Sequence, residues 1–284
     1  MPQGSWLSPL SFLVLINDLS TGCPVHKYVD DTTLSEVLPP KQLTSNMETY
    51  LHNLIDWATL NDMQLNTAKT KEMILGNVAR ANLPLLTTTT TATTATDTIN
   101  RVTSFKLLGV YIDSTMSWTI HVDNMVKKAT CRLYFLNQLK RSGLTSKQLF
   151  HYYNAVVRPV LEYCAPVWHY AVTKSQTQQL EAIQKRTIQI VLNFSREMPY
   201  TSMLFAADLN SLASCREDIS RKFFQDVTKP TSCLHHLLPD PKLPSYNSRL
   251  RSYEKFPRPY TRTKQYRSVV QYALSHYHDR VYNN

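Results

Sequence analysis

Apolar residues recur at helical spacing from Trp118 onward, and this periodicity constrains the fold more than any other feature of the sequence. One stripe predicts a long amphipathic helix that ends near Gly143. The residues of this stripe are Val122, Val126, Ala129, Leu133 and Leu136. A second helix is predicted from Ser146 to about Val160, with a kink at Pro159, and a third over 175–192. A further helix is expected around 209–227.

The first part of the chain has shorter and more varied patterns. Residues 9–16 predict a short buried helix with Ser8 as its N-cap, and residues 43–62 predict an amphipathic helix. Runs at 25–29 and 32–37 predict a β-hairpin that turns at Asp30 and Asp31, and further strands are expected at 72–75 and 101–113. Nine of the twelve residues from Thr87 to Thr98 are threonine, which predicts a loose surface loop, with threonine-rich strands as the alternative.

Charge divides the chain in the same way. The formal net charge is +10, yet residues 1–113 hold 7 basic and 10 acidic side chains, whereas residues 114–284 hold 24 and 11. A polyanionic partner for the second part is therefore expected. Residues 239–267 are rich in proline, arginine and tyrosine, a mixture that suits binding of unpaired nucleic acid and equally suits a disordered tail.

Five scattered cysteines and the lack of a long apolar run suggest where the protein resides. The cysteines form no C-x-x-C pair and no dense framework, which is typical of a reduced protein. We expect an intracellular protein of the nucleus or cytoplasm, not secreted and not bound to a membrane. A zinc site at Cys215, Cys233, His235 and His236 is a weak alternative because the spacing is not that of a zinc finger.

The adjacent carboxylates of Asp30 and Asp31 are the most informative short motif. Two carboxylates on a tight turn offer the oxygen ligands that Mg²⁺ prefers. Acidic turns are common, however, and most isolated pairs of this kind are solvated loop residues.

Several motifs in a fixed order give the acidic turn a context. Residues 2–18 read PQGSWLSPLSFLVLIND, residues 27–33 KYVDDTT, residues 65–70 LNTAKT and residues 105–110 FKLLGV, with a helix ending at Trp57 between them. In this order the motifs resemble the reverse transcriptases of non-LTR (LINE-type) retrotransposons, which are transposable elements. The resemblance implies the carboxyl-terminal part of an RNA-directed DNA polymerase, a nucleotidyltransferase.

The resemblance implies a role for individual residues. Asp30, Asp31 and Lys69 would be catalytic, with Asp30 and Asp31 as ligands of a two-metal Mg²⁺ site; Gln3, Gly4 and Tyr28 would line the nucleotide and template; Leu108 and Gly109 would hold the primer. Contacts to the nucleic-acid backbone would come from Lys127, Lys128, Arg132, Arg258, Arg262, Lys264 and Arg267. The implied partners are an RNA template, a DNA primer and a nucleoside triphosphate, with no specific protein partner.

The expected architecture is α+β. An incomplete polymerase palm is expected at 1–115, a helical thumb at 116–195 and a basic, partly ordered C-terminal region at 196–284. The family's first palm carboxylate and its fingers precede the segment that matches residues 2–4, so the metal site would be incomplete and the chain inactive alone. The alternatives are a non-catalytic nucleic-acid-binding remnant and, less well supported, a structural interaction protein.

Overall fold

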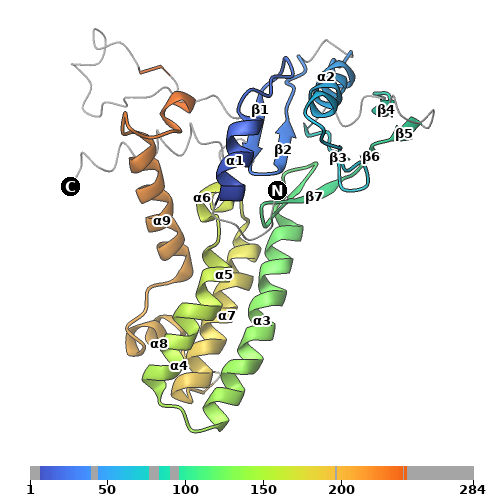
Figure 1. Ribbon diagram of the computed structural model, residues 1–284. Helices are drawn as coiled ribbons and strands as arrows, with labels where there is room; N and C mark the ends of the chain where they lie inside the picture. The colour runs from blue at the N-terminus through green and yellow to red at the C-terminus, as the bar shows by residue number, and fades with distance from the viewer. Residues whose placement is uncertain are drawn as a thin grey trace, which may run out of the picture. The chain divides into compact units, whose positions relative to one another are not determined.

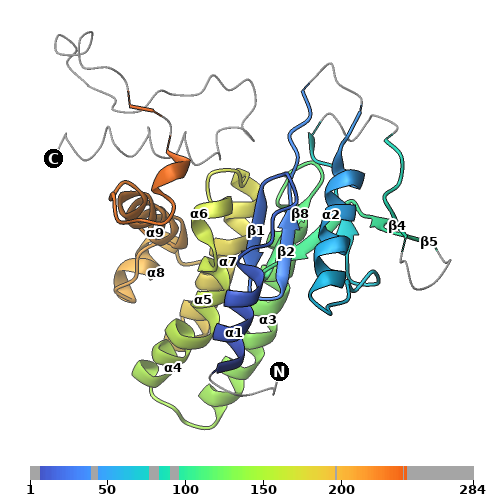
Figure 2. The same ribbon diagram turned by 45° about the horizontal axis from the view of Figure 1, so that its top comes forward.

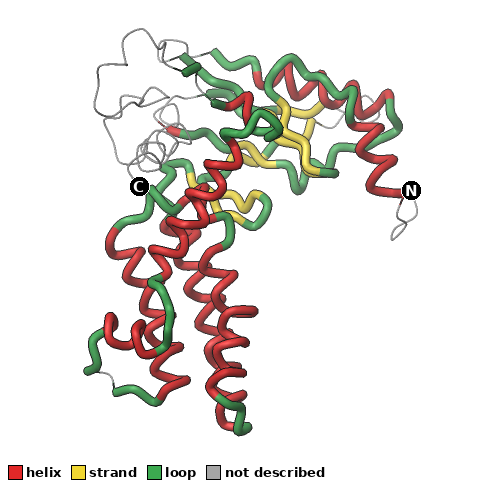
Figure 3. The backbone as a smooth tube through the Cα atoms, turned by 90° about the vertical axis from the view of Figure 1, so that its left-hand side faces the viewer, coloured by secondary structure: helices red, strands yellow, loops and turns green. Residues whose placement is uncertain are grey.

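The chain folds into two compact units of different character. The computed structural model describes residues 7–39, 44–76, 83–89, 96–195, 197–238 and 240–241. The first unit comprises Met1–Lys106 and Asp113–Thr115, and the second, here called the helical unit, comprises Leu107–Ile112 and Met116–Asn284. Short two-stranded sheets characterise the first unit and helices the second (Figures 1 and 3). The α+β class is thus as predicted.

The predicted hairpin at the acidic turn is present in the first unit. β1 (Val25–Tyr28) pairs antiparallel with β2 (Asp31–Leu34), with Val25 opposite Leu34 and Tyr28 opposite Asp31. Val29 and Asp30 form the two-residue turn, and Val29 has a positive φ of 54°. The β-branched side chain makes this conformation unfavourable, so the pairing of the strands must hold it.

The helix before this hairpin differs from the expectation. α1 (Leu7–Ile16) begins at Leu7, so Ser8 is not its N-cap, and of those of its residues whose side chains the structure describes, only the last, Ile16, is buried. Leu7, Leu10, Leu13 and Val14 are exposed. The Nζ of Lys27 donates to the carbonyl oxygens of Ile16, Asn17 and Leu19 at 2.8, 3.2 and 3.0 Å. These bonds satisfy carbonyls that a helix end leaves without partners, and they fix where α1 stops.

The remaining elements of the first unit are held by polar contacts. α2 (Met47–Leu60) is tied to the segment after α1, since Trp57 Nε1 donates to Asp18 Oδ1 at 3.1 Å and Asn53 Nδ2 donates to the Thr21 carbonyl at 2.9 Å. β3 (Lys71–Glu72) runs parallel to β6 (Asn100–Arg101), and Arg101 forms an ion pair of 2.8 Å with Glu72.

The described parts of the threonine-rich stretch, residues 87–89 and 96–98, form strands, in agreement with the alternative interpretation of the sequence. β4 (Thr87–Thr89) pairs antiparallel with β5 (Thr96–Thr98). Threonine is β-branched, and its stiff side chain favours extended backbone. All sheets among the described residues have two strands. No polymerase palm is therefore identified, which corrects the expectation for residues 1–115.

A β-hairpin whose residues are divided between the two units precedes the packed helices of the helical unit. β7 (Ser104–Leu107) and β8 (Val110–Asp113) are joined by Leu108 and Gly109, whose φ angles of 46° and 90° define a type I′ turn. The helices are α3 (Thr119–Arg141), α4 (Ser146–Tyr152), α5 (Arg158–Glu162), α6 (Ala165–Trp168), α7 (Lys174–Leu192), α8 (Tyr200–Ala206) and α9 (Leu212–Val227), with the π-helix η2 (Tyr153–Val157) and the 3₁₀-helix η3 (His235–Leu237).

α3 and α7 run parallel, side by side, and this arrangement organises the unit. At their N-terminal ends the Gln176 amide donates to the Ser117 carbonyl and the Thr119 hydroxyl at 3.4 and 3.2 Å. At their C-terminal ends Lys140 Nζ donates to the Ile190 carbonyl and to Asn193 Oδ1. The segment α4–η2–α5 lies between α3 and α7 in the sequence. It packs against α3 (Figures 1 and 2).

The predicted second helix is divided at its centre. Pro159 lacks an N–H, and the π-helical turn η2 lies directly before it, between α4 and α5. The guanidinium of Arg132 on α3 donates to the Val156 carbonyl of this turn. The kink predicted at Pro159 is therefore a π-helical turn stabilised by a neighbouring helix. No helix among the described residues is long and apolar enough to cross a membrane.

Candidate functional site

A groove lies between α3 and α7 in the helical unit. Its volume is about 610 Å³, a size typical of ligand-binding clefts. α3 contributes Val126, Thr130, Leu133, Tyr134 and Asn137, and α7 contributes Gln179, Ala182, Ile183, Arg186 and Ile190. Leu133 and Ile183 are buried and form an apolar floor, whereas Tyr134 and Arg186 are exposed.

Cations lie along the α3 side of this groove. Lys127 and Arg141 are exposed and lie seven residues before and after Tyr134. Because seven residues make about two helical turns, these three side chains share one face and are spaced about 10 Å apart. Arg186 faces them from α7. The groove therefore combines an apolar floor, an exposed aromatic ring and positive charge on both sides.

The acidic side chains of α3 and α7 neutralise little of the positive charge of the groove. On α3 the acid is Asp123, exposed one turn before Lys127. On α7 it is Glu181, which faces the N-terminus of α9, where its carboxylate accepts hydrogen bonds from the backbone N–H groups of Leu212 and Ala213 at 3.2 and 2.7 Å. Because the Glu181 carboxylate is directed to α9, it does not neutralise the groove cations, and the net charge of the groove is positive.

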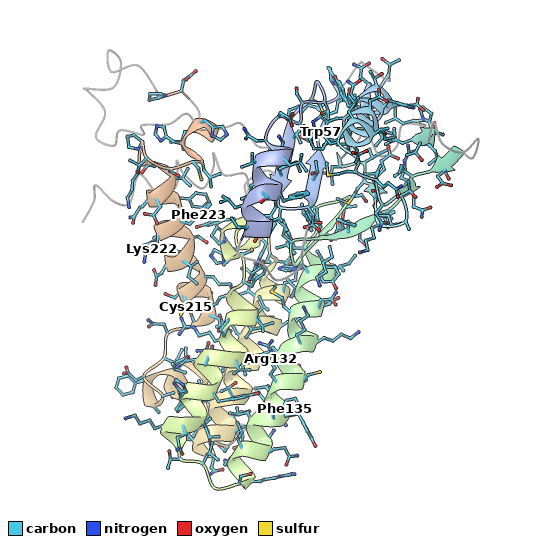
Figure 4. All side chains as sticks on the ribbon, viewed as in Figure 1. Trp57, Arg132, Phe135, Cys215, Lys222 and Phe223 are labelled. Atoms are coloured by element: carbon cyan, nitrogen blue, oxygen red, sulfur yellow. The ribbon has the colours of Figure 1, made fainter. Side chains whose placement is uncertain are left out.

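The three α3 cations named from the sequence do not act together. Lys127 lies on the side of α3 that faces the groove. Lys128, the next residue, lies on the side of α3 that faces away from the groove, which it shares with Phe135. Arg132 is turned inward and is engaged by η2. Figure 4 shows Arg132 and Phe135 on α3. Tyr134, Arg141, Gln179 and Arg186 were not predicted from the sequence: the seven-residue spacings of Tyr134 with Arg141 and of Gln179 with Arg186 are local signals, but the sequence does not show which helix faces α3.

A buried cluster of aromatic and cationic side chains joins α3, α6 and α9. The His121 ring meets Trp118 and Trp168 edge to face, at centroid distances of 6.1 and 5.6 Å. The Arg216 guanidinium lies 5.5 Å from the centre of the Trp168 ring. Trp168 is 0 % exposed, and its Nε1 donates to the Tyr163 carbonyl at 2.8 Å. The contacts of this cluster hold α6 against α9.

Arg216 is the most unusual member of the cluster. Its side chain is 0 % exposed, and none of its three nitrogens has a hydrogen-bond partner among the residues that the structure describes. Burial lowers the pKa of Arg216. A buried cation without hydrogen bonds is costly, because it loses its hydration, which the contact with the Trp168 ring and the charges of Glu181 and Glu162 offset only in part.

Two histidines, His121 within this cluster and His169 beside it, are held neutral. Burial, followed by the charge of Lys128, lowers the pKa of His121 to about 4. Burial, followed by the charge of Arg216, lowers the pKa of His169 to about 4, with Glu217 acting in the opposite direction. His121 Nδ1 accepts from the Tyr111 N–H at 3.3 Å, so the neutral form fits its contacts.

We therefore expect the stability of the helical unit to fall as the pH drops from 6.5 toward 4. The unfolded histidines bind protons in this range and the folded ones do not, so protonation favours unfolding; above pH 6.5 the contribution is fully present. Urea unfolding at several pH values measures the slope. His121→Gln with His169→Gln should flatten it, whereas exposed His151→Gln is the matched control; an unchanged slope in the double variant would contradict the expectation.

The acidic turn does not by itself build a two-metal site. Asp30 and Asp31 are exposed, and Tyr28 is exposed beside them on β1. Within the described ranges no group of three or more His, Cys, Asp or Glu side chains is placed to hold a metal ion. Two adjacent carboxylates do not fit a two-ion site, which needs several bridging ligands, and no step through Mg²⁺ is derived. Nor do Cys215, Cys233, His235 and His236 form a zinc cluster.

The other residues named from the sequence are dispersed. Lys69 is exposed in a turn in which its N–H donates to Asn66 Oδ1 at 3.0 Å. Leu108 and Gly109 form the β7–β8 turn, where Tyr163 OH donates to the Leu108 carbonyl at 2.7 Å, and a Cβ at Gly109 would lie 3.1 Å from the Tyr163 ring. Gln3, Gly4, Arg258, Arg262, Lys264 and Arg267 lie outside the described residues.

Comparison with known proteins gives one match, and it falls on α3. Residues 118–158 match the family model of the alkylated DNA repair protein alkB homolog 8, N-terminal. The matched segment covers α3, α4 and η2, a small part of the chain. Neither a curated protein nor a solved structure matches the chain.

This finding overturns the identification from sequence motifs. The match is to the alkB homolog 8 N-terminal family and not to a reverse transcriptase, so the assignment of the chain to a non-LTR retrotransposon and to an RNA-directed DNA polymerase is wrong. Two of the described motifs have an ordinary structural role. The acidic turn closes a two-residue hairpin, and Gly109 supplies a positive φ in another.

Proposed function

We propose that the helical unit is a nucleic-acid-binding module and that the groove between α3 and α7 is its binding surface. The observation that carries this proposal is an apolar groove lined by the exposed Tyr134 and by Arg186, with Lys127 and Arg141 two helical turns either side of Tyr134 on the same face of α3. Cations pair with phosphates while aromatic rings and apolar walls receive bases, and proteins that bind nucleic acid combine both.

The family match is compatible with this proposal. The matched family is named for a protein that repairs alkylated DNA, and the match includes the α3 half of the groove. Several of the described cations outside the groove have other roles. Arg158 and Arg221 form ion pairs of 2.7 Å with Glu162 and Glu217, and Lys140 caps the end of α7. The groove cations, in contrast, are exposed and form no ion pair with another described residue.

Binding of a fluorescein-labelled 20-nucleotide oligonucleotide, followed by anisotropy over a series of salt concentrations, tests the proposal. The whole chain should bind, with log K falling linearly with log salt at about −0.7 per phosphate neutralised on a single strand. The triple variant Lys127→Ala, Arg141→Ala, Arg186→Ala should bind more weakly, and its slope should be smaller in magnitude by about 2.

The matched control removes three exposed lysines from other elements. Lys147→Ala, Lys222→Ala and Lys229→Ala change the net charge equally, at α4, α9 and the segment after α9. This control should retain the wild-type slope. The proposal is wrong if the whole chain does not bind, or if the control loses as much as the groove variant. Binding of an amphipathic peptide in place of the oligonucleotide would identify the groove as a protein-docking site.

A further inference from the structure

We infer that the groove selects single-stranded over double-stranded nucleic acid and that Tyr134 is the residue that determines this specificity. The inference rests on the proposed function of the groove and names the form of its ligand. The juxtaposition that supports it is an exposed aromatic ring beside an apolar floor, with Lys127 and Arg141 on its own helix and Arg186 across the groove on α7.

Tyr134 is exposed to an unusual degree for its size. The side chain is 60 % exposed, although a tyrosine normally buries a large apolar area. It contacts the neighbouring Phe135 edge to face, with a centroid distance of 5.6 Å. This contact occupies the side of the ring pair away from the groove, because Phe135 is not among the lining residues. The Tyr134 ring remains available to a flat group that enters the groove.

The floor of the groove favours a base and not a phosphate. Leu133 and Ile183 at its base are buried and apolar, and Val126 and Ile190 extend the same surface. A phosphate placed there would lose its hydration without gaining a hydrogen-bond donor, whereas the face of a base loses little. The phosphates are better placed beside Lys127, Arg141 and Arg186 at the edges.

Polar groups on the walls suit the edges of an unpaired base. Asn137 uses one N–H toward the Leu133 carbonyl at 3.2 Å and keeps its side-chain oxygen for another partner. The Gln179 amide is exposed, and it forms no hydrogen bond with the rest of the described chain. In a duplex the bases are stacked and paired, so neither the ring nor these amides would reach them. A duplex would contact the cations alone.

The test compares single strands with duplexes on the whole chain. The probes are a labelled 20-nucleotide DNA, an RNA of the same sequence, and the duplex of each with its complement. Tyr134→Leu should weaken binding of the single strands by about 5- to 150-fold, the effect of losing one stacked base. Duplex affinity should change less than about twofold, and the salt slope should stay constant because no charge is lost.

Two variants of matched size isolate the ring. Tyr134→Phe keeps the stacking surface and should bind single strands within about twofold of the wild type. Phe135→Leu removes the neighbouring exposed ring outside the groove and should also have little effect. The DNA and RNA arms separate the two sources of a single strand: equal losses assign the contact to the base, and a larger loss for RNA adds a contact of the tyrosine hydroxyl with the ribose.

The failure of this inference differs from the failure of the proposed function. If the whole chain binds neither strand nor duplex, the groove is not a nucleic-acid site. If it binds the duplex as tightly as the single strand, or if Tyr134→Leu weakens both alike, the groove binds nucleic acid through its cations and the inference about single strands is overturned. Circular dichroism of each variant confirms that the fold is retained.

Discussion

Replacing Trp168 with alanine is expected to destabilise the helical unit by about 3–5 kcal/mol. The ring is 0 % exposed and is enclosed by His121, Arg216 and the Tyr163 carbonyl, so its removal leaves a cavity and strands the guanidinium. The melting temperature, followed by circular dichroism, should fall by roughly 6–20 °C. Val167→Ala is the matched control, since Val167 is the adjacent residue of α6 and is 51 % exposed. A similar loss in both variants would mean that α6 as a whole, and not the buried ring, determines stability.

Replacing Arg216 with methionine is expected to stabilise the helical unit by about 1–4 kcal/mol. Methionine fills much of the same volume and contacts Trp168 without the cost of a desolvated charge. Lys222→Met, at an exposed position of the same helix, should change stability by about 0.5 kcal/mol or less. Chemical unfolding gives the difference. A clear loss of stability in Arg216→Met would show that the guanidinium has partners that offset its burial.

The sequence predicted the amphipathic helices well and the short helices poorly. α3, α7 and α9 each carry a stripe of apolar residues with a 3.6-residue period, which is a local signal. α6 and α8 have only four and seven residues, too few to show a period. Their helical form depends on contacts with α7 and α9 that no local pattern contains.

Only part of the candidate site could be predicted from the sequence, because contacts between helices leave no local pattern. The positive charge of the second part of the chain, and Lys127 as an exposed cation, followed from composition and spacing. The roles of Arg132 and Arg186 did not, because the first depends on a π-helical turn and the second on α7 lying parallel to α3. The apolar run at 9–16 was expected to be buried, yet apolar composition alone does not reveal whether a helix has a partner.

The parallel pairing of α3 and α7 also determines where the entropy cost of folding is concentrated. The contact of Gln176 with Ser117 joins residues 59 apart in sequence, and that of Lys140 with Ile190 joins residues 50 apart. An antiparallel helical hairpin closes a loop of only a few residues, and closing about 50 residues in place of about 5 costs roughly 2 kcal/mol more. Individual helices form from local contacts, but the floor of the groove is assembled only when this long loop closes. The surface proposed to bind nucleic acid therefore depends on non-local contacts, which slow folding relative to local helical pairing.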